Sequence, residues 1–111
     1  MGKNNSLSLV ELEGIDPIYI ESFMNKHSEI KDSFAFSSVD EVSNINKLII
    51  AYVSDNMLDS MQLKKFIQSQ THIKPDFFIR VANIPKEGNG KIQRKKLAQE
   101  ILFHVNANKK N

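Results

Sequence analysis

Residues 47–54 read Lys-Leu-Ile-Ile-Ala-Tyr-Val-Ser, and the part from Leu48 to Val53 is the longest apolar run of the chain. This run has the length of a strand and is far shorter than the roughly 18–20 residues that a membrane span needs. Because nearly every position is apolar, both faces of the strand are predicted to be buried. The stretch is the clearest strand of the sequence, and the other elements can be placed relative to it.

Three further stretches are predicted to be strands. Residues 7–12 alternate loosely between apolar and polar side chains, which indicates a short N-terminal strand. Residues 33–38 place Phe34 and Phe36 on one face of a second strand. Residues 77–82 are another strongly apolar segment of strand length.

Three helices are predicted, over residues 17–27, 60–70 and 94–105, each with an apolar stripe at helical spacing. Asp16 and Asp59 stand where N-cap residues belong. The resulting order β-α-β-β-α-β-α with short connections predicts an α+β fold. We expect a small, about three-stranded sheet with helices packed on it, plus the short N-terminal strand.

The composition excludes several classes of protein. A chain of 111 residues and 12.7 kDa is one domain, and its 41% hydrophobic residues suffice for a core. The sequence has no cysteine, which excludes a disulfide scaffold, a thiolate zinc site and a cysteine nucleophile. The first six residues contain no apolar segment typical of a secretory signal, so we expect a cytoplasmic protein.

Few side chains form a pattern typical of catalysis. The histidines His27, His72 and His104 fall in three different predicted segments, without the spacing of metal ligands, so no metal site is predicted. No serine or aspartate stands near them in a nucleophile motif, and no two carboxylates are marked as an acid–base pair. These histidines and carboxylates therefore do not indicate a catalytic site.

Charge is unevenly distributed. Residues 1–85 carry a net charge of −3 and residues 86–111 a net charge of +5, which together give the overall +2. A basic C-terminal quarter indicates either a surface that meets an anionic partner or a solvated face, and the charge pattern alone favours the solvated face.

The basic quarter begins with a distinctive loop. Gly88-Asn89-Gly90 can adopt positive φ angles without strain and would present Lys91 from a defined turn. A lysine in that position is suited to phosphate or carboxylate oxygens. The segment is not a P-loop, because Pro85 and Ile92 occupy positions where that motif needs glycine and Ser or Thr. From these residues alone, a plain hairpin-like turn with a solvated lysine is the favoured interpretation.

The same segment resembles the C-terminal signature of the adenylate-forming superfamily, which includes acyl- and aryl-CoA synthetases, adenylation domains of nonribosomal peptide synthetases, and luciferases. The family pattern is roughly P-x-x-x-N-G-K-[IV]-[DQ]-[RK]-x-x-L. The matching residues are Pro85, Asn89, Gly90, Lys91, Ile92, Arg94 and Leu97, and Gln93 stands where the family most often has Asp. A second family segment is approximated by Gly14, Pro17, Ile20, Glu21, Met24, His27 and Ile30.

The resemblance covers nearly the whole chain and corresponds to the small C-terminal lid domain of these enzymes. It implies that residues 1–6 are a hinge or lead segment, with Asn4 or Asn5 at the hinge position. It further implies that residues 7–107 form the lid domain and that 108–111 are a disordered tail.

The resemblance also implies a function. Lys91 would be the catalytic lysine that helps activate a carboxylic acid to acyl-AMP. Asn89, Gly90 and Arg94 would form the substrate- and phosphate-binding loop. The complete enzyme would use ATP and Mg²⁺, held mainly by a large N-terminal adenylation domain present in cis or in trans. The acyl group would then pass to a pantetheine thiol of CoA or of an acyl carrier protein.

Two alternatives remain open at this stage. A free-standing or degenerate lid could serve as a docking or regulatory protein. A small nucleic-acid-binding module is the other alternative, but the sequence contains no signature of the common nucleic-acid-binding folds and no aromatic residues between the basic ones. Nucleic acid and membrane are therefore not expected as partners.

Overall fold

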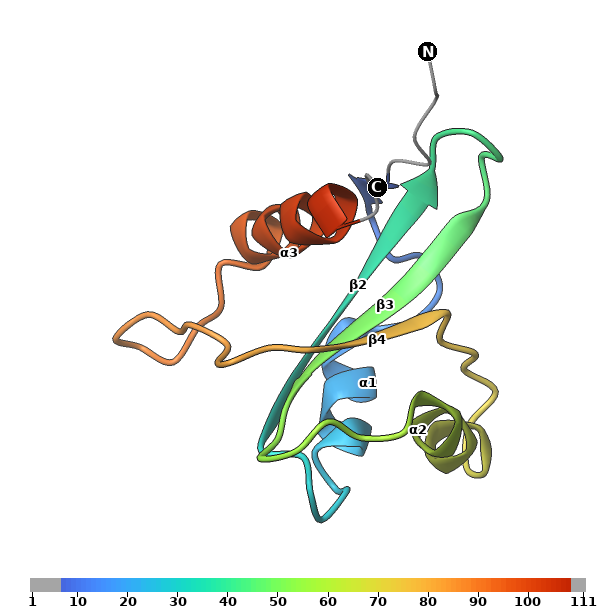
Figure 1. Ribbon diagram of the computed structural model, residues 1–111. Helices are drawn as coiled ribbons and strands as arrows, with labels where there is room; N and C mark the ends of the chain where they lie inside the picture. The colour runs from blue at the N-terminus through green and yellow to red at the C-terminus, as the bar shows by residue number, and fades with distance from the viewer. Residues whose placement is uncertain (1–6, 109–111) are drawn as a thin grey trace.

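The computed structural model describes residues 7–108, which fold into one mixed sheet with helices on both faces (Figure 1). The strands are β1 (Leu7–Val10), β2 (Asp32–Asp40), β3 (Asn46–Val53) and β4 (Phe77–Arg80). The helices are α1 (Pro17–Met24), α2 (Ser60–Gln68) and α3 (Arg94–Asn108). The predicted α+β class is confirmed.

The strands lie in the order β1-β2-β3-β4. β2 is antiparallel to both β1 and β3, whereas β4 is parallel to β3. The parallel pair follows from the connection, since α2 carries the chain back so that β4 starts at the same end as β3. The predicted N-terminal strand, β1, is thus part of the same sheet, at its edge next to β2.

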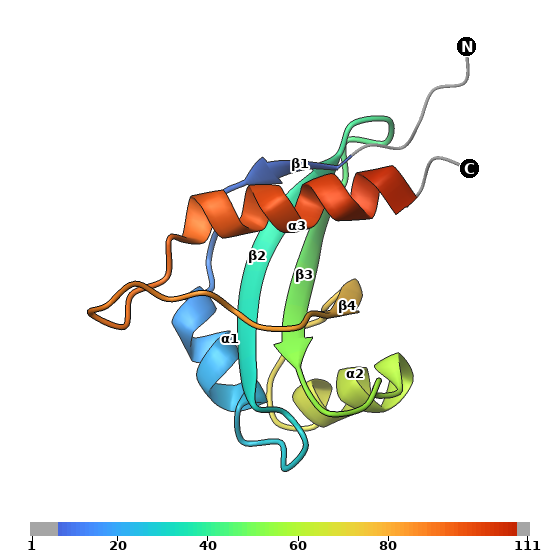
Figure 2. The same ribbon diagram turned by 60° about the vertical axis from the view of Figure 1, so that its left-hand side comes forward.

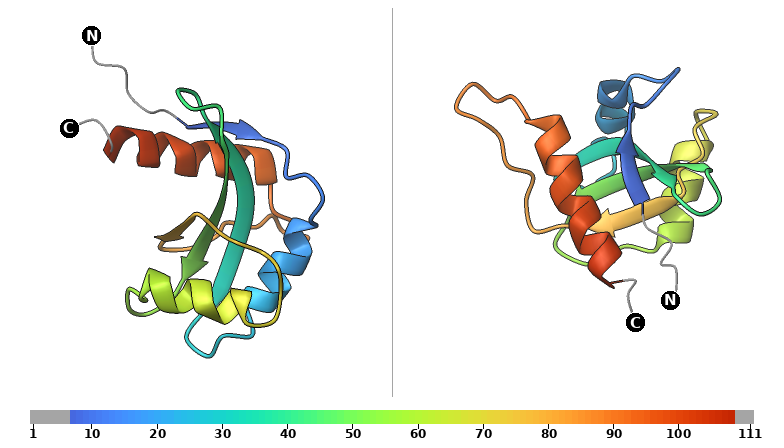
Figure 3. Two further views of the ribbon diagram at one scale, coloured as in Figure 1. Left: turned by 90° about the vertical axis from the view of Figure 1, so that its right-hand side faces the viewer. Right: turned by 90° about the horizontal axis from the view of Figure 1, so that it is seen from above.

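The helices cover opposite faces of the sheet, with α1 and α2 on one side and α3 on the other (Figures 2 and 3). β3 contributes to both sides, since Ile50 and Tyr52 face α1 and α2 while Ile49 and Ala51 face α3. All four are at most 2% exposed. The prediction that both faces of this strand are buried is confirmed.

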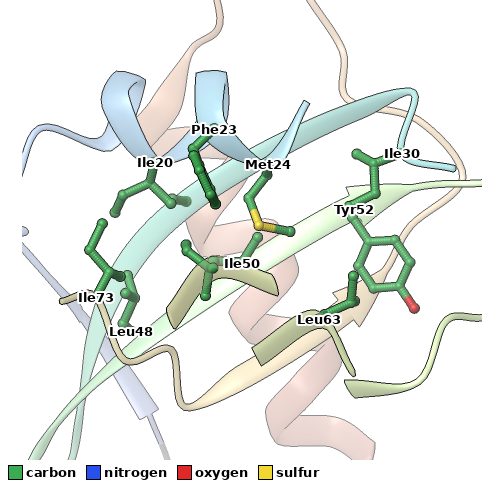
Figure 4. Close-up of a cluster of buried hydrophobic side chains, with 11 residues drawn as sticks. Ile20, Phe23, Met24, Ile30, Leu48, Ile50, Tyr52, Leu63 and Ile73 are labelled. Atoms are coloured by element: carbon green, nitrogen blue, oxygen red, sulfur yellow. The ribbon is translucent and has the colours of Figure 1, made fainter. Parts of the chain in front are cut away.

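The larger core lies between the sheet and the α1–α2 side (Figure 4). Ile20 and Met24 of α1, Leu63 of α2 and Ile50 of β3 all belong to this buried cluster. Burial of each such side chain contributes about 1.5–3 kcal/mol relative to leaving it in water. This packing holds α1 against β2, an arrangement that the candidate site depends on.

Both predicted helix caps are present. The Asp16 carboxylate accepts a hydrogen bond from the Ile18 amide, and the Asp59 carboxylate accepts one from the Met61 amide, each at 2.9 Å. Each bond satisfies an amide that has no partner within its own helix. These local signals explain why the starts of α1 and α2 agree with the sequence prediction.

The helix predicted over residues 17–27 ends earlier, at Met24. Asn25 closes the helix with its amide bonded to the Glu21 carbonyl at 2.9 Å. The Ser33 hydroxyl donates to the side-chain oxygen of Asn25 at 2.8 Å. The turn that returns the chain into β2 is thus held by contacts with the sheet, which helical periodicity does not report.

The other ends differ by a few residues. β1 and β4 are each two residues shorter than predicted, and α2 ends at Gln68. α3 continues past residue 105 to Asn108, the first position of the predicted tail, and residues 109–111 lie outside the described part. The Asn106 side chain bonds both the amide and the carbonyl of Leu7, at 3.0 and 3.1 Å, and so ties α3 to β1. None of the helices within residues 7–108 has the length and apolar character needed to cross a membrane.

Candidate functional site

The segment between β4 and α3 forms a loop that reaches away from the helices (Figure 2). Two hydrogen bonds close its tip, from the Gly90 amide to the Glu87 carbonyl and from the Glu87 amide to the Lys91 carbonyl, both 2.8 Å. Asn89 accepts from the Lys91 amide through its side chain at 3.1 Å. Gly90 has a φ of 84°, a backbone conformation that favours glycine. The tip is therefore a defined turn.

Lys91 is exposed at this turn. Among residues 7–108 its ammonium group has no hydrogen-bond or ion-pair partner, although its main chain takes part in closing the turn. The lysine thus stands on a fixed backbone with its charge free to meet an anion. A lysine ammonium is a compact point charge on a long stem, which suits phosphate and carboxylate oxygens.

Arg94, the first residue of α3, lies in a different environment. Its guanidinium donates two hydrogen bonds to the Glu21 carboxylate of α1, at 2.6 and 2.8 Å, in a forked arrangement. The guanidinium also lies over the ring of Phe34, 5.4 Å from the ring centre. The hydrogen bond with Glu21 raises the pKa of Arg94 above its ordinary value. Its phosphate-binding role stays a prediction, since within residues 7–108 the guanidinium is engaged with Glu21.

The base of the loop is anchored on the α3 side of the sheet. Ile84 is buried in the core beneath α3, and Lys86 forms an ion pair with Asp32 at the start of β2. Ile92 packs half-buried against the same core. A hollow of about 340 Å³ lies beside the loop, lined by Lys86, Lys96, Glu87, Glu100 and neighbouring residues. Because its charges are of both signs, the hollow is not a preformed phosphate pocket, and Lys91 does not line it.

The structure brings Asn89, Gly90 and Lys91 together in one turn, as the sequence predicts. Asn4 and Asn5, the predicted hinge, lie outside the described residues. The partnership of Glu21 with Arg94 was not predicted from the sequence. The available signal was a carboxylate between Ile20 and Met24 on the buried side of a predicted helix, where an unpaired charge would be costly.

No group of three or more metal-binding side chains is found in the part of the chain that the structure describes. What the arrangement offers chemically is the unpaired ammonium group of Lys91 on a hydrogen-bonded turn, three residues before the Arg94 guanidinium, which is paired with the buried Glu21 carboxylate. The structure is thus a small α+β domain that presents Lys91 at its surface.

Comparison with known proteins identifies the class of this domain. No family model matches the chain. Tyrocidine synthase 3 of Brevibacillus parabrevis is 36% identical over 80 residues, which cover 70% of this chain and 1% of that protein. A benzoate CoA ligase from Burkholderia xenovorans shares the fold with a TM-score of 0.66 and 25% identity, over 78% of this chain and 19% of that one.

A four-domain nonribosomal peptide synthetase bound to AMP and glycine is similar over 73% of this chain and 6% of its own, with a TM-score of 0.60 and 28% identity. The chain therefore spans only a small part of each of these relatives. Together with the fold and the turn that carries Lys91, these similarities show that the chain is a domain of the adenylate-forming superfamily.

Proposed function

We propose that the chain is the C-terminal lid domain of an adenylate-forming ligase, and that Lys91 is its catalytic lysine. The observation that carries the proposal is the unpaired, exposed ammonium group of Lys91 on a hydrogen-bonded turn. The match of residues 85–97 to the family signature and the similarity to a CoA ligase and to peptide synthetases support it.

The chemistry follows from the position of the charge. When a carboxylate attacks the α-phosphorus of ATP, negative charge builds on the phosphate oxygens as pyrophosphate leaves. A fixed ammonium group that contacts those oxygens in a closed site stabilises the transition state more than the ground state. Lys91 would make this contact once the lid covers a large domain that holds ATP, Mg²⁺ and the acid.

The second half-reaction needs a thiol. In the proposed enzyme the pantetheine thiol of CoA or of an acyl carrier protein attacks the carbonyl carbon of acyl-AMP, and AMP leaves. The lid would rotate about a hinge at Asn4 or Asn5 and present another face for this step. Movements of this kind gate many enzymes. The large domain would be the principal partner, linked in cis or added in trans.

The proposal is tested by restoring a complete enzyme. The chain is fused to, or mixed with, an adenylation domain that lacks its own lid, and pyrophosphate release is measured with ATP and the acid. Lys91→Ala should slow acyl-AMP formation by about 10²–10³-fold. Thioester formation from preformed acyl-AMP should survive, because another face of the lid serves it.

Lys95→Ala and Lys96→Ala are the matched controls, since both lysines are exposed at the nearby start of α3. They should change the rate little. The assignment of the catalytic lysine is wrong if Lys91→Ala keeps full activity. It is also wrong if Lys95→Ala or Lys96→Ala loses activity instead. A wild-type chain that gives the large domain no rate enhancement would point to a docking or regulatory role.

A further inference from the structure

Glu21 occupies an unusual position for a carboxylate. It lies on α1 with 7% of its surface exposed, and three hydrogen bonds converge on its two oxygens. Two come from the Arg94 guanidinium and one, at 2.7 Å, from the main-chain amide of Ala35 in β2. A single buried side chain thus joins α1, β2 and the first residue of α3.

The turn that carries Lys91 depends on its two ends for its orientation. In the described part of the chain, the hydrogen bonds found for residues 87–91 stay within residues 87–93. These bonds give the turn its shape but do not connect it to the body of the fold. The body holds the turn through the Lys86–Asp32 ion pair on one side and through Ile92 and Arg94 on the other.

These anchors differ in what they determine. The half-buried side chain of Ile92 holds the chain against the core, but apolar contacts have little directionality. The Lys86–Asp32 pair is a single contact with a flexible lysine. The fork between Arg94 and Glu21 consists of two nearly parallel bonds, which fix direction as well as distance. Arg94 is the first residue of α3 and lies three residues after Lys91, so the fork constrains the C-terminal end of the segment that carries Lys91.

We propose that Glu21 is a positioning residue that aims Lys91 through its forked bond to Arg94. Glu21 itself is buried and contacts no substrate. The catalytic consequence rests on the proposed function, whereas the effect on the orientation of the turn does not. The two parts can therefore be tested separately.

The first test measures orientation in the 111-residue chain by NMR. Glu21→Gln removes the charge but keeps an acceptor for the Ala35 amide, and Arg94→Lys keeps a charge but loses the fork. We expect lower backbone order parameters and altered residual dipolar couplings at Gly90 and Lys91 in both variants, with unchanged couplings in β2 and β3. Unchanged values at Gly90 and Lys91 in a folded variant would overturn the proposal.

Two variants are used so that the proposal can still be tested if one of them does not fold. Should Glu21→Gln not fold, Arg94→Lys still tests the fork, because Arg94 is one-third exposed and its replacement disturbs the core less. Asp55→Asn is the matched control. It also converts the carboxylate of an ion pair to an amide, but Lys31 and Asp55 belong to neither α1 nor α3. The control should leave the values at Gly90 and Lys91 as in the wild-type chain.

The second test measures catalysis in the enzyme restored with a large domain. Glu21→Gln and Arg94→Lys should lower kcat for acyl-AMP formation by about 10- to 100-fold, the scale expected of a misplaced catalytic group. KM for ATP should hardly change, because the large domain binds the nucleotide. The double variant should be no slower than the slower single variant, since both changes break the same fork.

The two proposals fail in different ways. If Lys91→Ala abolishes adenylation while Glu21→Gln and Arg94→Lys retain wild-type kcat, the positioning role is refuted and the proposed function stands. If Lys91→Ala leaves adenylation unchanged, the proposed function is refuted, and the NMR measurement alone decides whether Glu21 aims the turn.

Discussion

The Glu21 carboxylate accepts a hydrogen bond from the main-chain amide of Ala35 at 2.7 Å, at a part of β2 that β1 does not reach. β1 pairs only with residues 37–40 of β2, whereas Ala35 lies further toward the start of the strand. α1 covers this part of the sheet, and its Glu21 supplies an acceptor in place of a strand carbonyl. A side chain thereby satisfies a buried amide that would otherwise lack a partner.

We predict that this contact contributes measurably to stability. Glu21→Ala leaves the Ala35 amide unsatisfied and removes the partner of Arg94, so it should lower the free energy of unfolding by about 2–3 kcal/mol. Glu21→Gln keeps an acceptor and should cost about 1 kcal/mol. Urea unfolding of the two variants checks the difference. Equal stability of the alanine and glutamine variants would contradict the assigned role of the acceptor.

Two glycines of the loop offer an internally controlled experiment. A Cβ atom at Gly88 or Gly90 would meet no atom within 4 Å, but only Gly90 has a positive φ, at 84°. Gly90→Ala should therefore strain the turn by about 1 kcal/mol, while Gly88→Ala should not. In the restored enzyme Gly90→Ala should slow acyl-AMP formation and Gly88→Ala should leave it unchanged. Identical rates for the two variants would show that the shape of the turn does not matter.

The purified chain alone should neither form acyl-AMP nor hydrolyse ATP. Lys91 is exposed, and nothing in the described fold holds an acid and a nucleotide next to it. Catalysis by positioning requires both reactants to be bound in a near-attack geometry. Pyrophosphate release by the chain without a second protein would contradict the need for a large domain.

The exposed ion pair between Lys31 and Asp55, 2.7 Å apart, predicts a small pH dependence. Hydrogen bonding and Coulomb attraction from Lys31 lower the pKa of Asp55 below its ordinary value of 3.8. The stabilisation is thus fully present above about pH 3.8, the value in the unfolded chain, and disappears as the pH falls through the lower folded-state pKa.

Asp55→Asn should consequently be slightly less stable than the wild-type chain at neutral pH and equally stable at strongly acidic pH. Because both side chains are exposed, high salt should shrink the difference. NMR titration of the Asp55 carboxyl group together with urea unfolding across this pH range checks the prediction. A difference that grows on acidification would have the wrong sign.

Much of the fold follows from local patterns in the sequence. The run of apolar residues in 47–54 predicts a strand buried on both faces, and β3 is packed in that way. Asp16 and Asp59 predict the starts of two helices correctly, because an N-cap acts within one helical turn. Helix ends were less predictable, as the early end of α1 at Met24 depends on contacts with β2.

In the candidate site, too, the features that depend on neighbouring residues were the ones predicted from the sequence. The turn of Asn89, Gly90 and Lys91 was evident because its glycines and its lysine are adjacent in the chain and their hydrogen bonds are local. The hinge at Asn4 or Asn5 and the domain limits at residues 6 and 107 stay predictions. So does the binding of phosphate by the loop.

The sequence by itself therefore determined which segments form strands and helices, and which turn presents the lysine. Only the tertiary structure decided that β4 runs parallel to β3, that β1 completes the sheet, and that Arg94 bonds to Glu21, 73 positions away. The physical reason is the distance along the chain over which each kind of interaction acts. Apolar periodicity, caps and glycine turns act between near neighbours, whereas strand order and buried ion pairs are selected by the packing of the whole core.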